Sequence, residues 1–136
     1  RPWGCYDVLL DTEFTKVKLI TVAPEQRLSY QSHTKRQEQW TVVKGRLTVI
    51  LDDEHLVFYP GESIHIPLGA KHRAWNETDE ITQFIEVQTG TYFGEDDIVR
   101  YEDDYSRAEL EHLRDGNYIG GLTMPEKNTN KLNKNG

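Results

Sequence analysis

Short segments in which apolar and polar residues alternate recur between residues 16 and 88, and they constrain the fold of this chain more than any other feature. Turn-forming residues such as Lys44-Gly45 and Pro60-Gly61 separate the segments. A period of two is typical of strands with one buried face. The spacing leaves no room for helices that would connect parallel strands, so we expect an all-β sandwich or barrel. The expected strands are Lys16–Val22, Trp40–Val43, Arg46–Leu51, Leu56–Tyr59, Ser63–Ile66 and Ile81–Gln88.

The size and charge of the chain narrow the class of protein. A chain of 136 residues is long enough for one domain with a sizeable core. Its formal net charge of -7 argues against nucleic acid as a partner, because phosphate backbones are bound by basic surfaces. The single cysteine, Cys5, excludes an internal disulfide, and no apolar run approaches the roughly 18 residues of a membrane span. We therefore expect a cytoplasmic protein that binds neither nucleic acid nor membrane.

The end of the chain differs in composition from the segments before it. Ser106 is a suitable helix N-cap with Glu109 three residues later, and Gly116 follows, so a short helix is expected over Ser106–Arg114. After Met124-Pro125 the sequence is rich in Asn and Lys, which is typical of a flexible tail. We expect a β-sheet domain over residues 1–107, a short helix and turn extension over 108–124, and the tail over 125–136.

Four side chains in this framework have the chemistry of metal ligands. Gln31 and His33 are two residues apart on an expected strand, so both point to the same face. Glu38 follows a polar stretch typical of a turn, and His72 follows the Pro67-Leu68-Gly69 turn at the head of another strand. Taken singly, each is more often an ordinary core or surface residue. Together, two imidazoles, a carboxylate and an amide oxygen suit Zn²⁺, Mn²⁺ or Fe²⁺.

The spacing of these residues resembles the two motifs of the cupin superfamily. The first motif is matched by Gln31-x-His33, Glu38 and Gly45, with Gln31 in place of the first histidine. The second motif is matched by Gly61, Pro67-x-Gly69, His72 and Asn76. The resemblance implies an all-β cupin jelly-roll, a double-stranded β-helix barrel. It also implies a divalent metal on Gln31, His33, Glu38 and His72, with Zn²⁺ expected first and Mn²⁺, Co²⁺ and Fe²⁺ as alternatives.

A closer resemblance covers residues 1–107. It is carried by Arg1–Gly4, Lys16–Lys18, Leu28–His33, Arg36–Gly45, Ile66–Arg73, Ile85–Arg100 and Asp104–Arg107. These segments resemble the type II phosphomannose isomerase cupin, which is usually the C-terminal domain of bifunctional mannose-6-phosphate isomerase/mannose-1-phosphate guanylyltransferases. The resemblance implies interconversion of mannose 6-phosphate and fructose 6-phosphate in nucleotide-sugar and polysaccharide biosynthesis, with a phosphorylated hexose as partner. Thr34 and Lys35 stand where family members often carry extra histidines. Guanylyltransferase activity is not implied, because the chain has no Gly-rich phosphate loop of that kind.

Three basic residues are expected to serve this chemistry. Arg36 lies between two expected ligands, at a position matching an arginine that the family uses in catalysis; the alternative is a solvated turn arginine. Lys16 and Lys18 share a strand face with apolar residues, an unusual place for charge unless that face lines a polar cavity. We expect Lys18 to be a catalytic residue that contacts phosphate or a hydroxyl, and Lys16 to bind substrate. The alternative is a pair of ordinary edge-strand lysines.

Further candidates lie toward the end of the β-rich region. Glu86 and Gln88 share a face of a strand whose other face is apolar, as in a barrel strand that lines a pocket. Glu86 is a candidate general base and Gln88 a substrate contact, although Glu86 could instead face solvent beside an arginine. Arg100 and Arg107 are expected phosphate clamps, because guanidinium binds phosphate bidentately. The nearby acidic run 95–97 could simply neutralise both arginines.

Two other functions stay open from the sequence. One is a non-catalytic sugar-phosphate-binding cupin module, since the family's partner domain is absent from these residues. The other is a different metal-dependent reaction, such as an iron oxygenase, because fold does not fix function. A homodimer through edge strands is a further expectation.

Overall fold

The computed structural model describes residues 1–102, and within them ten strands form two five-stranded antiparallel sheets. The strands are β1 (Gly4–Asp11), β2 (Thr15–Val22), β3 (Tyr30–Ser32), β4 (Arg36–Lys44), β5 (Leu47–Leu51), β6 (Glu54–Phe58), β7 (Ser63–Ile66), β8 (His72–Trp75), β9 (Thr82–Gly90) and β10 (Val99–Glu102). The first sheet has the order β1-β2-β9-β4-β7, and the second has the order β10-β3-β8-β5-β6.

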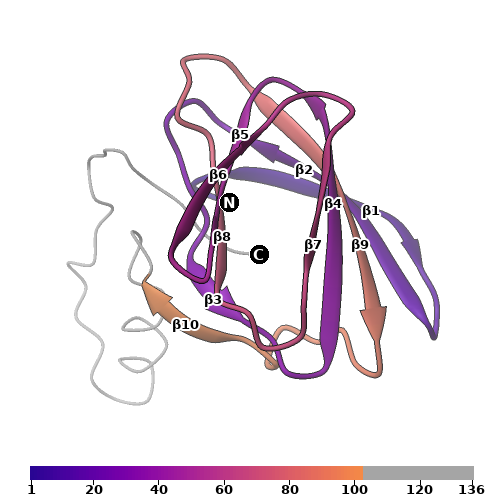
Figure 1. Cartoon of the computed structure of the whole chain (residues 1–136). Coiled ribbons are helices and arrows are strands. Elements are labelled where there is room, and N and C mark those ends of the chain that lie inside the picture. Colours follow the sequence, from indigo (N-terminus) through magenta and orange to yellow (C-terminus); the bar gives the residue numbers. More distant parts are fainter. Residues whose placement is uncertain (103–136) are drawn as a thin grey trace, which may run out of the picture.

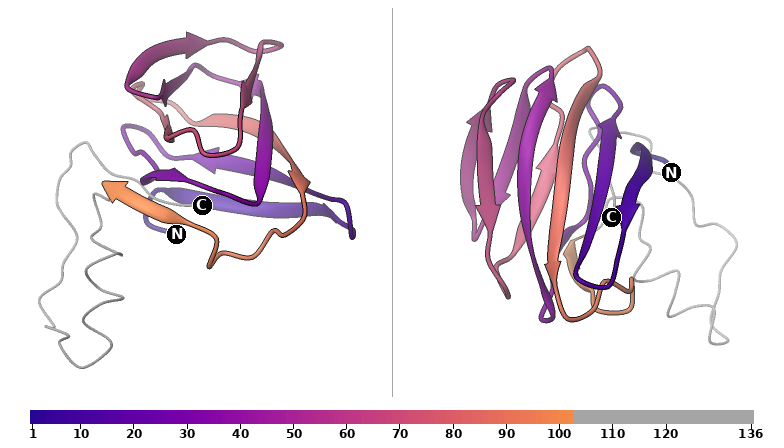
Figure 2. Two further views of the ribbon diagram at one scale, coloured as in Figure 1. Left: turned by 60° about the horizontal axis from the view of Figure 1, so that its bottom comes forward. Right: turned by 90° about the vertical axis from the view of Figure 1, so that its right-hand side faces the viewer.

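The chain passes repeatedly from one sheet to the other. Strands β3, β5, β6, β8 and β10 belong to the second sheet, and the strands between them in sequence return to the first. The two sheets face each other around one interior (Figure 1). Strand β1 forms an edge of the first sheet, beside β2 (Figure 2). This is the topology of a jelly-roll, so the expected all-β barrel is confirmed.

Most strand positions agree with the sequence pattern, with one informative difference. Strand β4 begins at Arg36, earlier than the apolar residues indicated, so Glu38 lies inside a strand and not after a turn. Strands β1 and β10 were not expected, because neither has a regular apolar alternation. The expected helix over 106–114, the tail and Arg107 lie outside the described residues. Within residues 1–102 the structure has no helix long and apolar enough to cross a membrane.

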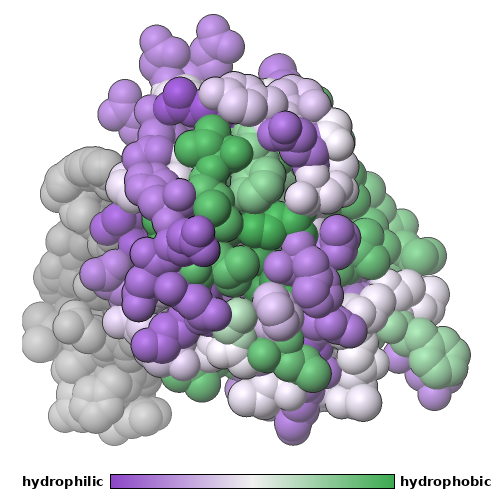
Figure 3. All heavy atoms as spheres, in the orientation of Figure 1, coloured by the Kyte–Doolittle hydropathy of each residue, from purple (hydrophilic) through white to green (hydrophobic). Residues whose placement is uncertain are grey.

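The interior of the first sheet changes from apolar to polar along its strands. Ile20, Phe84 and Val42 form an apolar row across β2, β9 and β4, and all three are buried. This row belongs to the hydrophobic core between the sheets, made of Trp3, Ile20, Val22, Leu28, Trp40, Val42, Leu47, Val49, Ile66, Ala74 and Phe84. In the orientation of Figure 1, apolar side chains gather in the opening between the sheets and polar side chains rim them (Figure 3).

Two polar rows follow the apolar one along the same three strands. The first contains Lys18 and Glu86 beside the core residue Trp40, and the second contains Lys16, Gln88 and Glu38. Because side chains two residues apart on a strand share a face, these charged groups lie on the same inner surface as the core. One end of the barrel interior therefore contains charged and polar side chains, while the rest contains the hydrophobic core.

Candidate metal centre

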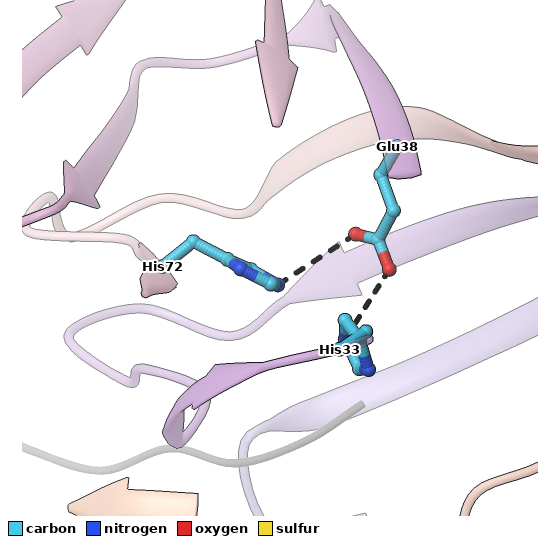
Figure 4. Close-up of side chains that lie close together, drawn as sticks. All are labelled: His33, Glu38 and His72. Carbon is cyan, nitrogen blue, oxygen red and sulfur yellow. Dashed lines mark ion pairs between the residues drawn. The ribbon is translucent and has the colours of Figure 1, made fainter. Parts of the chain in front are cut away.

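His33, Glu38 and His72 converge inside the barrel from both sheets (Figure 4). All three are buried, and their ligand atoms lie within 4.8 Å of one another. Nε2 of His33 is 3.4 Å from one carboxylate oxygen of Glu38, and Nε2 of His72 is 3.8 Å from the other. Two imidazole nitrogens and a carboxylate directed at a common point are a donor set for a divalent transition metal.

Backbone carbonyls fix the tautomers of both histidines. Nδ1 of His33 lies 3.1 Å from the carbonyl oxygen of Asp97, and Nδ1 of His72 lies 3.0 Å from that of Ala70. A carbonyl can only accept a hydrogen bond, so each Nδ1 carries a proton, which leaves Nε2 of each ring as the nitrogen available to a metal. Holding the second ring nitrogen in this way is how proteins orient metal-ligating histidines.

Gln31 occupies the neighbouring position on the second sheet. It pairs with His72 between β3 and β8, so the two side chains share the inner face, and Gln31 is 4% exposed. Within residues 1–102, Oε1 of Gln31 and Nε2 of His72 are both buried without a hydrogen-bond partner. Unsatisfied buried polar atoms are costly unless a ligand completes them. An amide oxygen and an imidazole nitrogen are both ligand atoms for a divalent metal, so the residues present fit the expected ion.

Glu38 is held as a carboxylate by its neighbours. Burial acts to raise its pKa, but the charges of Arg36 and His72 outweigh burial and lower the pKa to about 2. Nε of Arg36 donates to one carboxylate oxygen at 2.9 Å, and Nε1 of Trp40 donates to the other at 2.9 Å. Arg36 is buried on β4, so it is not the solvated turn residue considered as an alternative.

His33 is neutral in this environment. Burial, followed by the nearby charges of Arg36 and His72, lowers the pKa of His33 to about 3. Arg36 also approaches Nε2 of His33 at 3.2 Å, so its guanidinium contacts two of the three candidate ligands. The imidazole is therefore in the protonation state that metal binding requires.

Glu86 is a second buried carboxyl beside this cluster. Burial and the charge of Glu38 raise the pKa of Glu86 to about 7. Nε2 of Gln88 donates to Oε1 of Glu86 at 2.8 Å, and both residues are buried. Glu86 is therefore not the solvent-facing residue considered as an alternative, and its protonation changes near neutral pH.

The basic residues expected at the site lie in different places. Lys18 is 2% exposed on β2, which is an inner strand and not an edge strand. Lys16 lies further along the same face and is half-buried. Arg100 pairs with Gln31 between β10 and β3, at the same level of the barrel. Arg107 lies outside the described residues.

Sequence reasoning did not place the loop between β9 and β10 at this site. The Asp97 carboxylate accepts hydrogen bonds from the backbone N–H groups of Thr34 and Lys35 and from the Thr34 hydroxyl. Arg36 donates to the carbonyl oxygen of Phe93 from the same loop. The acidic run 95–97 was the one available signal, but nothing in its sequence indicates which strand it would contact.

Comparisons with known proteins agree with this architecture. Residues 1–103 match the family described as mannose-6-phosphate isomerase C-terminal. The chain is 48% identical over 108 residues to the xanthan biosynthesis protein XanB of Xanthomonas campestris pv. campestris (strain B100), covering 79% of this chain and 23% of that protein. The chain therefore spans less than a quarter of the length of that relative.

Solved structures share the fold. A Klebsiella pneumoniae protein described as having a double-stranded beta-helix domain superposes with a TM-score of 0.65 at 22% identity, covering 73% of this chain and 84% of that one. A Cupin 2 conserved barrel domain protein from Salinispora arenicola superposes with a TM-score of 0.56 at 24% identity, covering 62% and 73% respectively. The expected cupin fold is confirmed.

Proposed function

The chain belongs to the mannose-6-phosphate isomerase C-terminal family, and on that premise we propose that it is a metal-dependent isomerase that interconverts mannose 6-phosphate and fructose 6-phosphate. The reaction moves a proton between C1 and C2 of the sugar through an enediol. It requires polarisation of a carbonyl oxygen and a base that carries the proton. The observation that carries the proposal is Glu86, a buried carboxyl whose pKa is raised to about 7 beside the candidate metal ligands.

The metal ligands in this proposal are Gln31, His33, Glu38 and His72. A divalent ion held there, with Zn²⁺ proposed and Mn²⁺, Co²⁺ and Fe²⁺ as alternatives, would supply Lewis-acid polarisation of the sugar oxygens. The Nδ1 hydrogen bonds that orient both histidines and the ionised Glu38 support this set.

Glu86 is the proposed general base. A base is most effective when its pKa is near the working pH, because it then both accepts and returns the proton readily. The hydrogen bond from Gln88 to Oε1 fixes the orientation of the Glu86 carboxyl and leaves Oε2 as the oxygen proposed to carry the proton. Gln88 is thus proposed to position Glu86 as well as to contact substrate.

The cationic groups are proposed to bind the substrate and its developing charge. Arg36 donates to Glu38 and approaches His33, so its guanidinium lies where negative charge would appear on a bound sugar. Lys18 and Lys16 supply positive charge from β2, and Arg100 from β10. Arg107, outside the described residues, keeps its proposed role as a phosphate contact.

Two attributes go with this function. A relative named for xanthan biosynthesis supports a role in nucleotide-sugar and polysaccharide synthesis, and phosphorylated sugars place such a role in the cytoplasm. A homodimer through β1 is supported by the exposure of Val8 (48%), Leu9 (55%) and Leu10 (48%) on that edge strand. Light scattering of the purified protein tests the dimer.

A non-catalytic sugar-phosphate-binding module is the second candidate. The observation that favours it is length: the chain covers only 23% of XanB, so this domain could act only beside other parts of a larger protein. In that case the same cluster of polar residues would bind the phosphosugar without turning it over.

One experiment separates the two. Purified protein is loaded with Zn²⁺, Mn²⁺ or Co²⁺, and fructose 6-phosphate formation is followed in a coupled assay beside calorimetric binding of mannose 6-phosphate. We expect turnover in wild type and a loss of at least about 100-fold in Glu86→Gln, since general-base catalysis is worth 10²–10⁴. Binding without turnover at any metal would instead establish the module.

A further inference from the structure

The buried ammonium group of Lys18 forms an ion pair with the carboxylate of Glu95, a partly exposed residue. Its side chain is 2% exposed, whereas that of Glu95 is 42% exposed, and Nζ of Lys18 lies 3.7 Å from Oε2 of Glu95. A lysine this deeply buried is rare unless its charge is paired. Glu95 therefore serves as the counter-ion of a cation that belongs to the interior.

The surroundings hold Lys18 in place independently of Glu95. Nζ lies 4.3 Å from the centre of the Tyr6 ring, a cation–π contact with the neighbouring strand β1. On its other side, Lys18 pairs with Glu86 between β2 and β9. The ammonium thus stays at the polar end of the barrel whichever anion occupies the position in front of it.

Glu95 reaches Lys18 from a loop with separate anchors. The carboxylate of Asp97 fastens this loop to Thr34 and Lys35, and Arg36 donates to the carbonyl of Phe93. Since these contacts hold the loop without using the Glu95 side chain, that side chain can leave Lys18 while the loop stays. Because the Glu95 side chain is 42% exposed, its carboxylate is hydrated by solvent when it leaves Lys18, which limits the cost of leaving.

We propose that Lys18 forms an anion subsite for the phosphate of the substrate and that Glu95 is an internal occupant which the phosphate displaces. The inference rests on the proposed function in taking a phosphorylated sugar as the ligand. A phosphate group carries more negative charge than a carboxylate and offers more acceptor oxygens, so it replaces Glu95 on a cation that burial has already desolvated. Glu95 acts as an internal competitor that sets the affinity of the site for phosphorylated ligands.

The test measures binding of inorganic phosphate to the metal-free protein by calorimetry. Glu95→Gln should tighten binding by about fivefold, which corresponds to the upper range of an ion pair of this exposure. Asp96→Asn is the matched control, because it removes the same charge from the same loop while Lys18 keeps its partner. It should change the affinity less than twofold.

A double-mutant cycle assigns the effect to Lys18. In Lys18→Met the tightening caused by Glu95→Gln should disappear, and in Lys18→Arg, which keeps a cation, it should remain. Thermal unfolding of each variant confirms that it is folded. If Lys18→Met does not fold, Lys18→Arg still tests whether a cation at this position preserves the effect of Glu95→Gln. Unchanged or weaker phosphate binding in Glu95→Gln, or an equal gain in Asp96→Asn, would overturn the proposal.

The proposal and the isomerase function fail in different ways. A gain that is seen with inorganic phosphate and mannose 6-phosphate but not with mannose supports the subsite, even if no turnover is found. If wild type turns over and Glu95→Gln binds both phosphate ligands with unchanged affinity, the subsite proposal is refuted and the isomerase proposal is retained.

Discussion

Glu38 on β4 and Glu86 on the neighbouring strand β9 are two buried carboxyls, each of which shifts the pKa of the other. Glu38 stays ionised because Arg36 and His72 oppose the effect of burial, whereas burial and the charge of Glu38 keep a proton on Glu86 up to about pH 7. The pair therefore holds one proton between two buried carboxyls, as two like charges at close range require. The proposed division of roles, Glu38 as metal ligand and Glu86 as base, is based on this asymmetry.

The first prediction concerns the stability of the metal-free protein between pH 4.5 and 6.5. The raised pKa of Glu86 favours folding below its ordinary value of 4.5, and this contribution is lost as pH rises through about 7. The lowered pKa of His33 favours folding above its ordinary value of 6.5, and this contribution is lost as pH falls toward 3. The two effects oppose each other, so wild type should change little across the window.

Glu86→Gln removes only the first effect. The free energy of unfolding of the variant should therefore increase with pH, by about 1.4 kcal/mol per pH unit between pH 4.5 and 6.5. Urea unfolding at pH 5 and pH 6.5 measures this slope. Equal slopes in wild type and variant would show that Glu86 does not hold its proton in the folded protein.

The second prediction concerns metal affinity. His72→Ala should lower the affinity for Zn²⁺ by more than about 100-fold. Loss of a residue that only hydrogen-bonds to a metal ligand already lowers metal affinity by about 10- to 100-fold. His65→Ala is the control, since His65 is exposed on β7 and hydrogen-bonds to Gln39 outside the cluster. Metal analysis and calorimetry measure both. Retention of metal by His72→Ala would contradict the assigned ligand set and the isomerase proposal that depends on it.

The third prediction concerns the carboxylate that anchors the β9–β10 loop. Asp97→Ala removes three hydrogen bonds, two to backbone N–H groups and one to the Thr34 hydroxyl, and should cost about 1–2 kcal/mol of stability. Thr34→Ala removes only the hydroxyl contact and should cost less. Denaturant unfolding measures both, and the reverse order would mean that Asp97 is not the main anchor.

The fourth prediction concerns a glycine at the end of β9. Gly90 faces Arg36 across the sheet, and a Cβ at Gly90 would clash with the carbonyl oxygen of Lys35. Gly90→Ala should push the start of β4 away and destabilise the protein by more than about 2 kcal/mol. Gly69→Ala tests backbone conformation alone, since Gly69 has φ +78 but open space at its Cβ, and should cost about 1–2 kcal/mol. A smaller loss in Gly90→Ala than in Gly69→Ala would refute the steric argument.

Local patterns in the sequence predicted the barrel well. Alternation with a period of two located strands such as β2, β5 and β9, because one face of each must be buried. Glu86 and Gln88 followed from the same rule, since polar residues on an otherwise inward face indicate a lined cavity. The start of β4 was less predictable, because the polar residues before Trp40 are buried by other charged groups and not by apolar packing.

Long-range pairings could not be obtained from sequence. The contact of Lys18 with Glu95 and the attachment of Asp97 to Thr34 join segments far apart in the chain, and each depends on where the β9–β10 loop crosses the barrel. Loops of this kind have no periodic pattern, and their course is decided by charge pairing once the sheets have formed.

The interior is separated into an apolar row on β2, β9 and β4 and two polar rows beside it, and this separation has a consequence for engineering. Residues of the hydrophobic core and residues of the proposed site occupy different levels of the same strands. Substitutions at the level of the proposed site would therefore change what the interior binds while the hydrophobic level kept the scaffold intact.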